Sequence, residues 1–298
     1  MKLVCMADTH ITDKQHRCRK DDCVKTQFEK LGYILEYSER NADAILIAGD
    51  VFDSPRNWIL LPKVMDIFSA YKIPKFCVVG QHDMYMYSRE HLWATNLGIL
   101  KKAGIVTVLS KNGYSIEGCN FFGMNWGEEN IPVAPENHTN ILLVHAPIAE
   151  TTIYPGGEYI DVLKFGEECD RFDLVVCGDI HRRFNVKVKG TTLVNSGPLM
   201  RRTADVYNME YEPGVWMYDT KTKETELVAI PHNVASQVID RSSIEDVSEN
   251  EERYKELISE LSKVKLTDVN LRGNIMKGLK KASISLRAKD IVIDLINQ

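Results

Sequence analysis

Five short apolar runs lie along the chain, and each ends abruptly in polar residues able to bind a metal ion or transfer a proton. The residues that follow the runs LVCMA, AILIAG, FCVVG, ILLV and LVVCG are Asp8 and His10, Asp50 and Asp53, Gln81, His82 and Asp83, His145, and Asp179 and His181. Uninterrupted apolar runs of this length are typical of strands buried in a parallel sheet. Because ligands gather outside the carboxyl ends of the strands in open α/β sheets, we expect these polar groups to converge on one small volume.

Two stretches with helical periodicity separate the first three runs. From Val24 to about Tyr37 apolar residues recur three or four positions apart, which predicts a helix inside a β-α-β unit. A second helix is predicted to begin with Ser54 as N-cap and Pro55 as its first residue. Its apolar face would comprise Ile59, Leu60, Val64, Ile67 and Phe68.

Beyond residue 100 the pattern changes to short strand-like pieces separated by Gly, Asn and Asp turns. The pieces are GIVTVL, YSIEGCNFFGM, FNVKVKG, TTLVNSG, GVWMYDT and ETELVAI. Together with the earlier β-α units they predict an α/β fold, a two-sheet α/β/β/α sandwich.

Composition narrows the class of protein. The 298 residues are 44% hydrophobic, enough for a substantial core. The net charge of -5 argues against a surface covered with basic residues that bind nucleic acid, but it does not exclude a local basic patch. The apolar stretch from Leu3 to Ala7 is too short for a signal peptide, and no run approaches the roughly 20 apolar residues of a membrane helix. The seven cysteines are scattered and odd in number, which favours a reducing, cytoplasmic location without membrane contact.

The predicted cluster mixes carboxylate, imidazole and amide groups, a set that suits Mn²⁺, Fe²⁺ or Zn²⁺. Asp50 follows Gly49 at a strand end, and its two carboxylate oxygens are enough to bridge two ions about 3.5–4 Å apart. Such a pair orients a nucleophile and holds a phosphate for in-line displacement. An isolated Asp or His at a strand end is usually a turn or packing residue, so the argument rests on five such motifs occurring together.

The spaced motifs DTH, GDVFD, GQHD, His145 and GDIH resemble the signature of the calcineurin-like metallophosphoesterases over about residues 1 to 230. Within that superfamily the stretches GDVFDS and VNSGPLMRRT most resemble the SbcD-type DNA repair nucleases. The resemblance implies one ion held by Asp8, His10, Asp50 and His181, and a second held by Asp50, Gln81, His145 and Asp179. It also implies that His82 is a catalytic, non-ligand imidazole, which Asp53 orients.

Two residues depart from the usual family pattern, and both belong to the second ion. Gln81 stands where the family usually has Asn, and Asp179 where it usually has His. Both can still donate oxygen, so we expect the second ion to be retained, with a preference for harder ions such as Mn²⁺ or Mg²⁺ over Zn²⁺.

Three further residues each have two possible roles. A substrate could contact Tyr85, Arg201 and Arg202. Alternatively, Tyr85 is an ordinary packing residue, and Arg201 and Arg202 are a solvated pair. His16, Cys18 and Cys23 look zinc-like but are one ligand short and irregularly spaced.

The last sixty or so residues have a different character. We expect residues 1–235 to form the catalytic domain and residues 236–298 a helical C-terminal region, with a capping box at Ser248 and Glu251. Acidic residues lie early in this region and basic residues late. A docking helix for an SbcC-type ATPase partner, a short DNA-binding cap, and an edge of the main domain all remain open, as does a homodimer.

The sequence therefore predicts a metal-dependent phosphodiester hydrolase that uses two divalent ions, Mn²⁺ before Mg²⁺ or Fe²⁺, and acts as a nuclease on DNA. Two alternatives stay open. One is a phosphatase or cyclic-nucleotide phosphodiesterase on the same fold, and the other is a non-catalytic binding module with a degenerate second metal site.

Overall fold

The computed structural model describes residues 1–152 and 158–242, which contain fourteen strands. One sheet is built from β1 (Lys2–Met6), β2 (Ala44–Ile47), β3 (Lys75–Cys77), β4 (Thr107–Val108), β13 (Gly214–Asp219) and β14 (Glu224–Ala229). The other is built from β5 (Tyr114–Ile116), β6 (Cys119–Met124), β7 (Thr139–Ala146), β10 (Leu174–Asp179), β11 (Phe184–Val188) and β12 (Thr191–Asn195). A small separate pair is formed by β8 (Ile148–Ala149) and β9 (Ile160–Asp161).

Both large sheets have parallel centres, and the predicted apolar runs occupy them. The strand orders are β14-β13-β1-β2-β3-β4 and β11-β12-β10-β7-β6-β5. The strands β1 to β4 are mutually parallel, as are β6, β7, β10 and β12, whereas β13, β14, β5 and β11 are antiparallel to their neighbours. The carboxyl ends of the parallel strands in each sheet consequently share one edge, as the sequence pattern requires.

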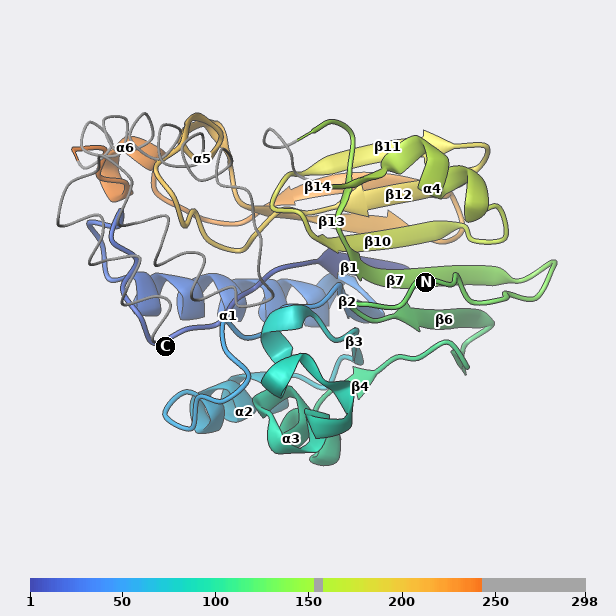
Figure 1. The fold of residues 1–298 in the computed structure, drawn as a ribbon, viewed down its shortest axis with the longest axis horizontal. Coiled ribbons are helices and arrows are strands. Elements are labelled where there is room, and N and C mark those ends of the chain that lie inside the picture. Colours follow the sequence, from blue (N-terminus) through green and yellow to red (C-terminus); the bar gives the residue numbers. More distant parts are fainter. Residues whose placement is uncertain (153–157, 243–298) are drawn as a thin grey trace, which may run out of the picture. The chain divides into compact units, whose positions relative to one another are not determined.

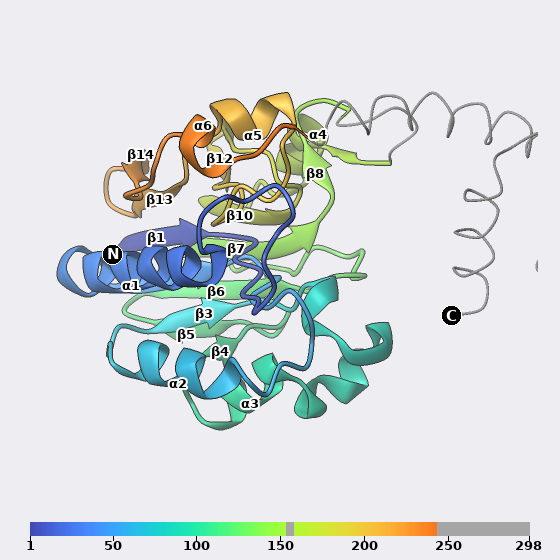
Figure 2. The same ribbon diagram turned by 90° about the vertical axis from the view of Figure 1, so that its left-hand side faces the viewer.

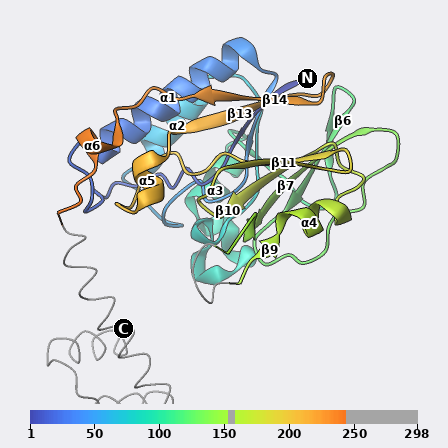
Figure 3. The ribbon, with the colours of Figure 1, turned by 90° about the horizontal axis from the view of Figure 1, so that it is seen from above.

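Helices cover the outer faces of the two sheets (Figure 1). They are α1 (Cys23–Asn41), α2 (Leu61–Ser69) and α3 (Asn96–Lys102) on one face and α4 (Val162–Glu168) on the other. The remaining helices are α5 (Val206–Glu210), α6 (Ala235–Val238) and the short 3₁₀ helices η1 (Gln81–Asp83), η2 (Tyr85–Tyr87) and η3 (Arg89–Ala94). Figure 3 shows α1 and α4 on opposite sides of the paired sheets.

The two faces of each strand pack in different layers because side chains alternate along a strand. In β1, Leu3 and Cys5 face the other sheet and contact a core that includes Ile141 and Val176, while Val4 and Met6 face α1 and α2. On the far side a third core joins β7 and β10 to α4. The predicted α/β/β/α sandwich is confirmed.

The helix α1 is longer than the periodicity predicted. Asp22 caps it, accepting a hydrogen bond from the Lys25 backbone N–H at 2.9 Å. Its buried face includes Phe28, Leu31 and Ile34, which cover β1 and β2.

The predicted start of the second helix at Ser54 is wrong. α2 begins at Leu61, with Pro62 in its first turn, and Ile59 is 80% exposed. The reason lies in Asn57, whose side-chain oxygen accepts from the Leu60 backbone N–H at 3.1 Å and holds the preceding segment as a turn. Pro55 therefore belongs to the segment before this turn, and Pro62 is the proline that begins the helix.

The chain comprises two compact units, Met1–Ile239 and Asp240–Gln298. The predicted capping box and amphipathic helix fall in residues 243–298, outside the described residues. Within the described ranges no helix is both long and apolar enough to cross a bilayer. All seven cysteines are free and buried.

Candidate metal centre

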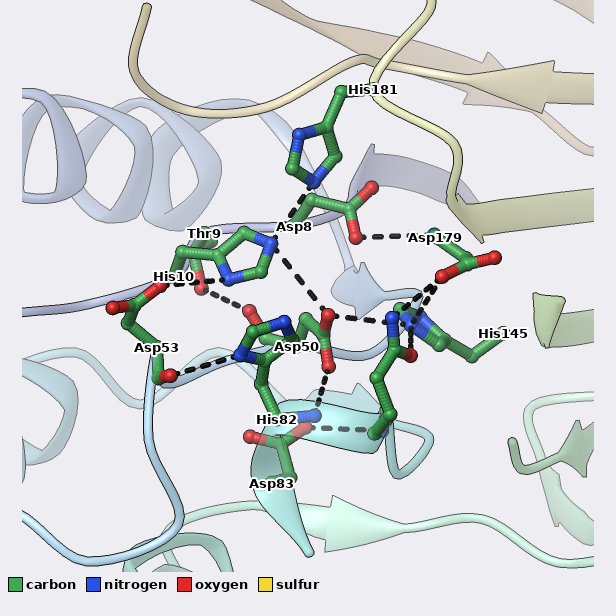
Figure 4. A network of polar contacts seen from close by, with 12 residues as sticks. Asp8, Thr9, His10, Asp50, Asp53, His82, Asp83, His145, Asp179 and His181 are labelled. Carbon is green, nitrogen blue, oxygen red and sulfur yellow. Dashed lines mark hydrogen bonds and ion pairs between the residues drawn. The ribbon is translucent and has the colours of Figure 1, made fainter. Parts of the chain in front are cut away.

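The strand ends bring the predicted ligands together at the carboxyl edge of the two sheets. In Figure 2 the dark blue loop after β1 lies in front of the strands at this edge. The side chains come from the loop after β1 (Asp8, His10), the loop after β2 (Asp50), η1 (Gln81, His82), β7 (His145), the end of β10 (Asp179) and the loop after it (His181). Figure 4 shows Asp8, His10, His82, His145, Asp179 and His181 arranged around Asp50.

The ligands expected for the first ion lie in contact. His10 Nε2 and His181 Nε2 are 3.0 Å apart, and the donor atoms of Asp8, His10 and His181 all lie within 4.8 Å of one another. Asp8 Oδ1 accepts a hydrogen bond from the Asp179 backbone N–H at 3.1 Å. The remaining oxygen, Asp8 Oδ2, is buried and has no hydrogen-bond partner in the described part of the chain.

Asp50 occupies the position expected of a bridging ligand. Its Oδ1 accepts from the His82 backbone N–H at 2.9 Å, while Oδ2 lies 3.6 Å from His10 Nε2 and 3.5 Å from His145 Nε2. Oδ2 is buried and, among the residues described, accepts no hydrogen bond. Burying an unpaired carboxylate oxygen is costly, so the orphaned oxygens of Asp8 and Asp50, flanked by imidazoles, fit divalent cations.

The ligands expected for the second ion also converge, but they already bond to one another. Gln81 Oε1 lies 2.7 Å from His145 Nε2, and Gln81 Nε2 donates to Asp179 Oδ1 at 2.7 Å. On its other ring nitrogen His145 donates from Nδ1 to the Ala48 carbonyl at 2.6 Å, which aims Nε2 at the cluster. An ion at this position must replace the contacts made by Gln81, so the assignment of this ligand set stays a prediction.

Burial and charge perturb the titration of these groups. Burial raises the pKa of Asp8 to about 8 and lowers those of His10 and His181 to about 4 and about 3. For His145 burial acts downward, but the close contact with the Asp50 carboxylate and its charge outweigh burial and raise the pKa to about 10. The chain without ions therefore holds a proton on Asp8 and on His145 near pH 7.

His82 and Asp53 are in contact, but not as expected. The His82 ring donates from Nδ1 to the backbone carbonyl of Asp53 at 2.9 Å. The Asp53 carboxylate instead bonds Arg202 and lies 3.4 Å from His10 Nδ1. Arg202 and His10 together hold the pKa of Asp53 well below its usual range, although burial acts upward. The main chain of Asp53 thus orients His82, while its carboxylate binds Arg202 and lies beside His10, a metal-ligand candidate.

Sequence reasoning gave Asp83 no role, yet it fixes the loops that carry the site. Its buried carboxylate accepts backbone N–H groups of Val51, Phe52 and Gly80 at 3.1 to 3.2 Å. Nearby, a Cβ on Gly80 would lie 2.1 Å from Asp50 Oδ1, so only glycine allows this approach. The sequence signal for Asp83 was its place directly after His82 in the motif GQHD.

A cavity of about 380 Å³ opens beside the cluster and is lined by groups that include His82, Arg202 and His16. Arg202 therefore lies where a phosphate contact was predicted. Arg201 does not. It is 3% exposed and its guanidinium bonds the carbonyls of Tyr211 and Asn233, so its role is structural.

Of the other candidates, His16 lines this cavity, whereas Tyr85, Cys18 and Cys23 do not. Tyr85 is not among its lining residues and packs under the Arg56 guanidinium, 3.5 Å from the ring centroid. The zinc-like trio does not form a site either: among the described residues every group of three donors within 4.8 Å belongs to the strand-end cluster. Cys18 instead directs its Sγ to the Arg202 carbonyl.

Comparison with known proteins agrees with this geometry. The family model described as calcineurin-like phosphoesterase matches residues 1–183. No curated protein matches the sequence significantly.

Solved structures share the fold at low sequence identity. The protein TT1561 of Thermus thermophilus is 12% identical, with a TM-score of 0.51 over 77% of this chain and 99% of that one. A putative 5'-nucleotidase from Staphylococcus aureus, solved with alpha-ketoglutarate, is 14% identical, with a TM-score of 0.50 over 84% of this chain and 58% of that one.

Proposed function

Since this chain belongs to the calcineurin-like phosphoesterase family, we propose that it is a metal-dependent phosphodiesterase that acts as a nuclease on DNA, of the SbcD type. The observation that carries the metal dependence is the pair of buried, unpartnered oxygens, Asp8 Oδ2 and Asp50 Oδ2, at the centre of converging imidazoles in the described part of the chain. The choice of DNA rests on the local resemblance of GDVFDS and VNSGPLMRRT to that group of nucleases.

The donor set would hold the ions on two sides of Asp50. Asp8, His10 and His181 would complete one side, and Gln81, His145 and Asp179 the other. Divalent ions bound there neutralise the charge of a phosphate and lower the pKa of an attacking water.

The chain's own residues supply the remaining steps. His82 donates its Nδ1 proton to the Asp53 carbonyl, so Nε2 is the ring nitrogen left for the cavity. As the imidazolium, with a proton on each ring nitrogen, His82 would give its Nε2 proton to the departing alcohol oxygen and keep the Nδ1 proton that binds the Asp53 carbonyl. Arg202, held by Asp53 at the cavity wall, would contact a non-bridging phosphate oxygen.

The test uses the full chain after removal of metal with a chelator. Labelled single-stranded and double-stranded DNA with defined ends is incubated with Mn²⁺, Mg²⁺, Zn²⁺ or chelator, beside a phosphomonoester and a cyclic nucleotide. We expect DNA cleavage that requires added ion and is fastest with Mn²⁺. Full activity in chelator would refute metal dependence, and a preference for the monoester or the cyclic nucleotide would move the assignment to the alternative hydrolases.

A matched pair of variants separates the site from the fold. Asp50→Asn removes the central carboxylate and should abolish cleavage, whereas Asp66→Asn changes a residue of α2 outside the site and should not. The proposal also includes an SbcC-type ATPase as a partner of residues 236–298, which pull-down of such an ATPase by the full chain and by a chain ending at residue 239 would test.

A further inference from the structure

The cavity beside the metal centre continues into two further hollows. The first shares Asp179, His181, Thr203 and Asn208 with the cavity and has a volume of about 290 Å³. The second, of about 350 Å³, shares Arg182 and Tyr207 with the first. Since neighbouring hollows share these lining residues, they lie side by side, and we call the two hollows beyond His181 the side groove.

Arg182 stands at the junction of the two hollows of the side groove. Its guanidinium lies over the Tyr207 ring, 3.8 Å from the centroid. Among the described residues it makes neither a hydrogen bond nor an ion pair. The side chain is partly exposed, so its N–H donors are available to a ligand in the groove.

A rigid stack holds Arg182 in place. Tyr207 stacks on Tyr211, with centroids 5.3 Å apart and an interplanar angle of 24°, and Arg183 lies over Tyr211 at 4.8 Å. The Tyr207 hydroxyl accepts from the Arg183 backbone N–H at 2.9 Å, and the Tyr211 hydroxyl bonds the Ser196 and Pro198 carbonyls. Little side-chain entropy is left to lose when Arg182 binds a ligand.

Two of the other charged side chains of the side groove, Arg183 and Asp205, are already engaged. Arg183 donates to the Ser196 and Glu212 carbonyls, and the Asp205 carboxylate caps α5 and bonds Thr203. Glu150 is an exposed residue at the far end. Arg182 is thus the guanidinium in this groove that is both oriented and unpaired within the described ranges.

We propose that the side groove binds the polynucleotide strand next to the scissile bond, with Arg182 contacting the phosphate of a neighbouring nucleotide. This inference rests on the proposed nuclease function and deepens it. A phosphomonoester or a cyclic nucleotide would occupy only the cavity beside the metal centre and would not need the side groove. A planar guanidinium binds phosphate oxygens through two parallel N–H donors, and Tyr207 keeps that plane fixed.

The test compares substrates of different length. Wild type, Arg182→Gln and Arg182→Lys are assayed on single-stranded DNA of two to twelve nucleotides and on bis(p-nitrophenyl) phosphate. Arg182→Gln should lower kcat/KM about tenfold on the longer strands, the range of one charged hydrogen bond, and leave the small diester within about twofold. Arg182→Lys keeps the charge and should recover part of the loss. Arg40→Gln removes an arginine in the last turn of α1, which pairs with Glu36, and should match wild type throughout.

A binding measurement separates this inference from the proposed function. Fluorescence anisotropy of a labelled hexanucleotide in chelator should show about tenfold weaker binding by Arg182→Gln and a salt slope lower by about 0.7, as expected for one lost phosphate contact to a single strand. If wild type binds the strand through Arg182 but cleaves no DNA, the nuclease proposal fails and the side groove stands. If wild type cleaves DNA and Arg182→Gln does so equally well, the side groove is refuted and the nuclease proposal stands. Equal losses on long and small substrates, or a lowered melting temperature in both Arg182 variants, would make Arg182 a structural residue and also refute it.

Discussion

Loading the metal centre should release about two protons at pH 7 and about one at pH 9. Without ions, Asp8 has a pKa raised by burial to about 8, so it holds about 0.9 proton at pH 7 and about 0.1 at pH 9. His145, whose pKa is raised to about 10 by Asp50 against the effect of burial, holds about 1.0 and about 0.9. His10 and His181 are neutral at both pH values, because burial lowers their pKa values to about 4 and about 3. Ion binding requires every ligand in its deprotonated form, so the protons on Asp8 and His145 must leave.

Titration calorimetry measures this number directly. Mn²⁺ is added to the chelator-treated full chain in buffers of different ionisation enthalpy, and the slope of the observed heat against that enthalpy gives the protons released. Asp8→Asn should lower the number at pH 7 to about one, while Asp66→Asn should leave it unchanged. Release of fewer than one proton at pH 7, or a number that does not fall between pH 7 and pH 9, would refute the reasoning.

Two further predictions concern the metal centre, and a third concerns the C-terminal region. Raised pKa values on Asp8 and His145 mean that the folded, ion-free chain binds these protons more tightly than the unfolded chain, so the contribution of these two groups to stability should fall by on the order of 3 kcal/mol from pH 7 to pH 9. Burial lowers the pKa values of Lys30 and Lys75 to about 7 and about 8, and their contributions rise over the same range with or without Mn²⁺. Thermal melts should therefore show that the stabilisation given by Mn²⁺ grows from pH 7 to pH 9, and a constant difference would contradict it. His82→Ala should lower turnover by roughly 10²–10⁴ while bound metal, counted by elemental analysis, stays near wild type; loss of both would make His82 a ligand. A chain ending at residue 239 should keep hydrolysis of a small diester, because every ligand candidate precedes residue 182, but should cleave long DNA more slowly and with a weaker salt dependence. An insoluble product, or unchanged DNA cleavage at every salt concentration, would count against a separate C-terminal module.

The sequence was sufficient for the architecture because the apolar runs carry two kinds of information at once. Their length indicates strands buried on both faces, and their polar ends indicate which edge of the sheet carries the chemistry. Leu3 and Val4, adjacent in sequence, pack in different cores, and this alternation follows from strand geometry alone. The boundary of α2 was less accessible, since Ser54-Pro55 offers the stronger local start signal, whereas the observed helix begins beside Pro62 without a side-chain cap. The Asn57 side chain decides between them.

The features of the site that differ from the prediction depend on contacts between residues far apart in the sequence. The Asp53 carboxylate bonds Arg202, which lies 149 residues later, and so leaves His82 to the Asp53 main chain. Sequence spacing cannot reveal such a partner. Arg201 and Arg202 are adjacent and chemically alike, yet one is buried against backbone carbonyls and the other lines the cavity. Only the path of the chain after β12 distinguishes them.

Backbone conformation is the feature of the site that the sequence conceals most. Asp8, His10, Asp50 and Asp179 all have positive φ angles, between 42° and 90°. Left-handed backbone costs an ordinary residue roughly 1–2 kcal/mol, and Asp bears it better than most because its short side chain can bond locally. Four such residues around one cluster are tolerated because the strands before them are buried, the Asp83 carboxylate fixes the loop that carries Asp50, and the His10 backbone N–H donates to the Asp50 carbonyl. The apolar runs therefore do more than deliver ligands to one edge, since their packing also sustains the strained turns that point those ligands at a common centre.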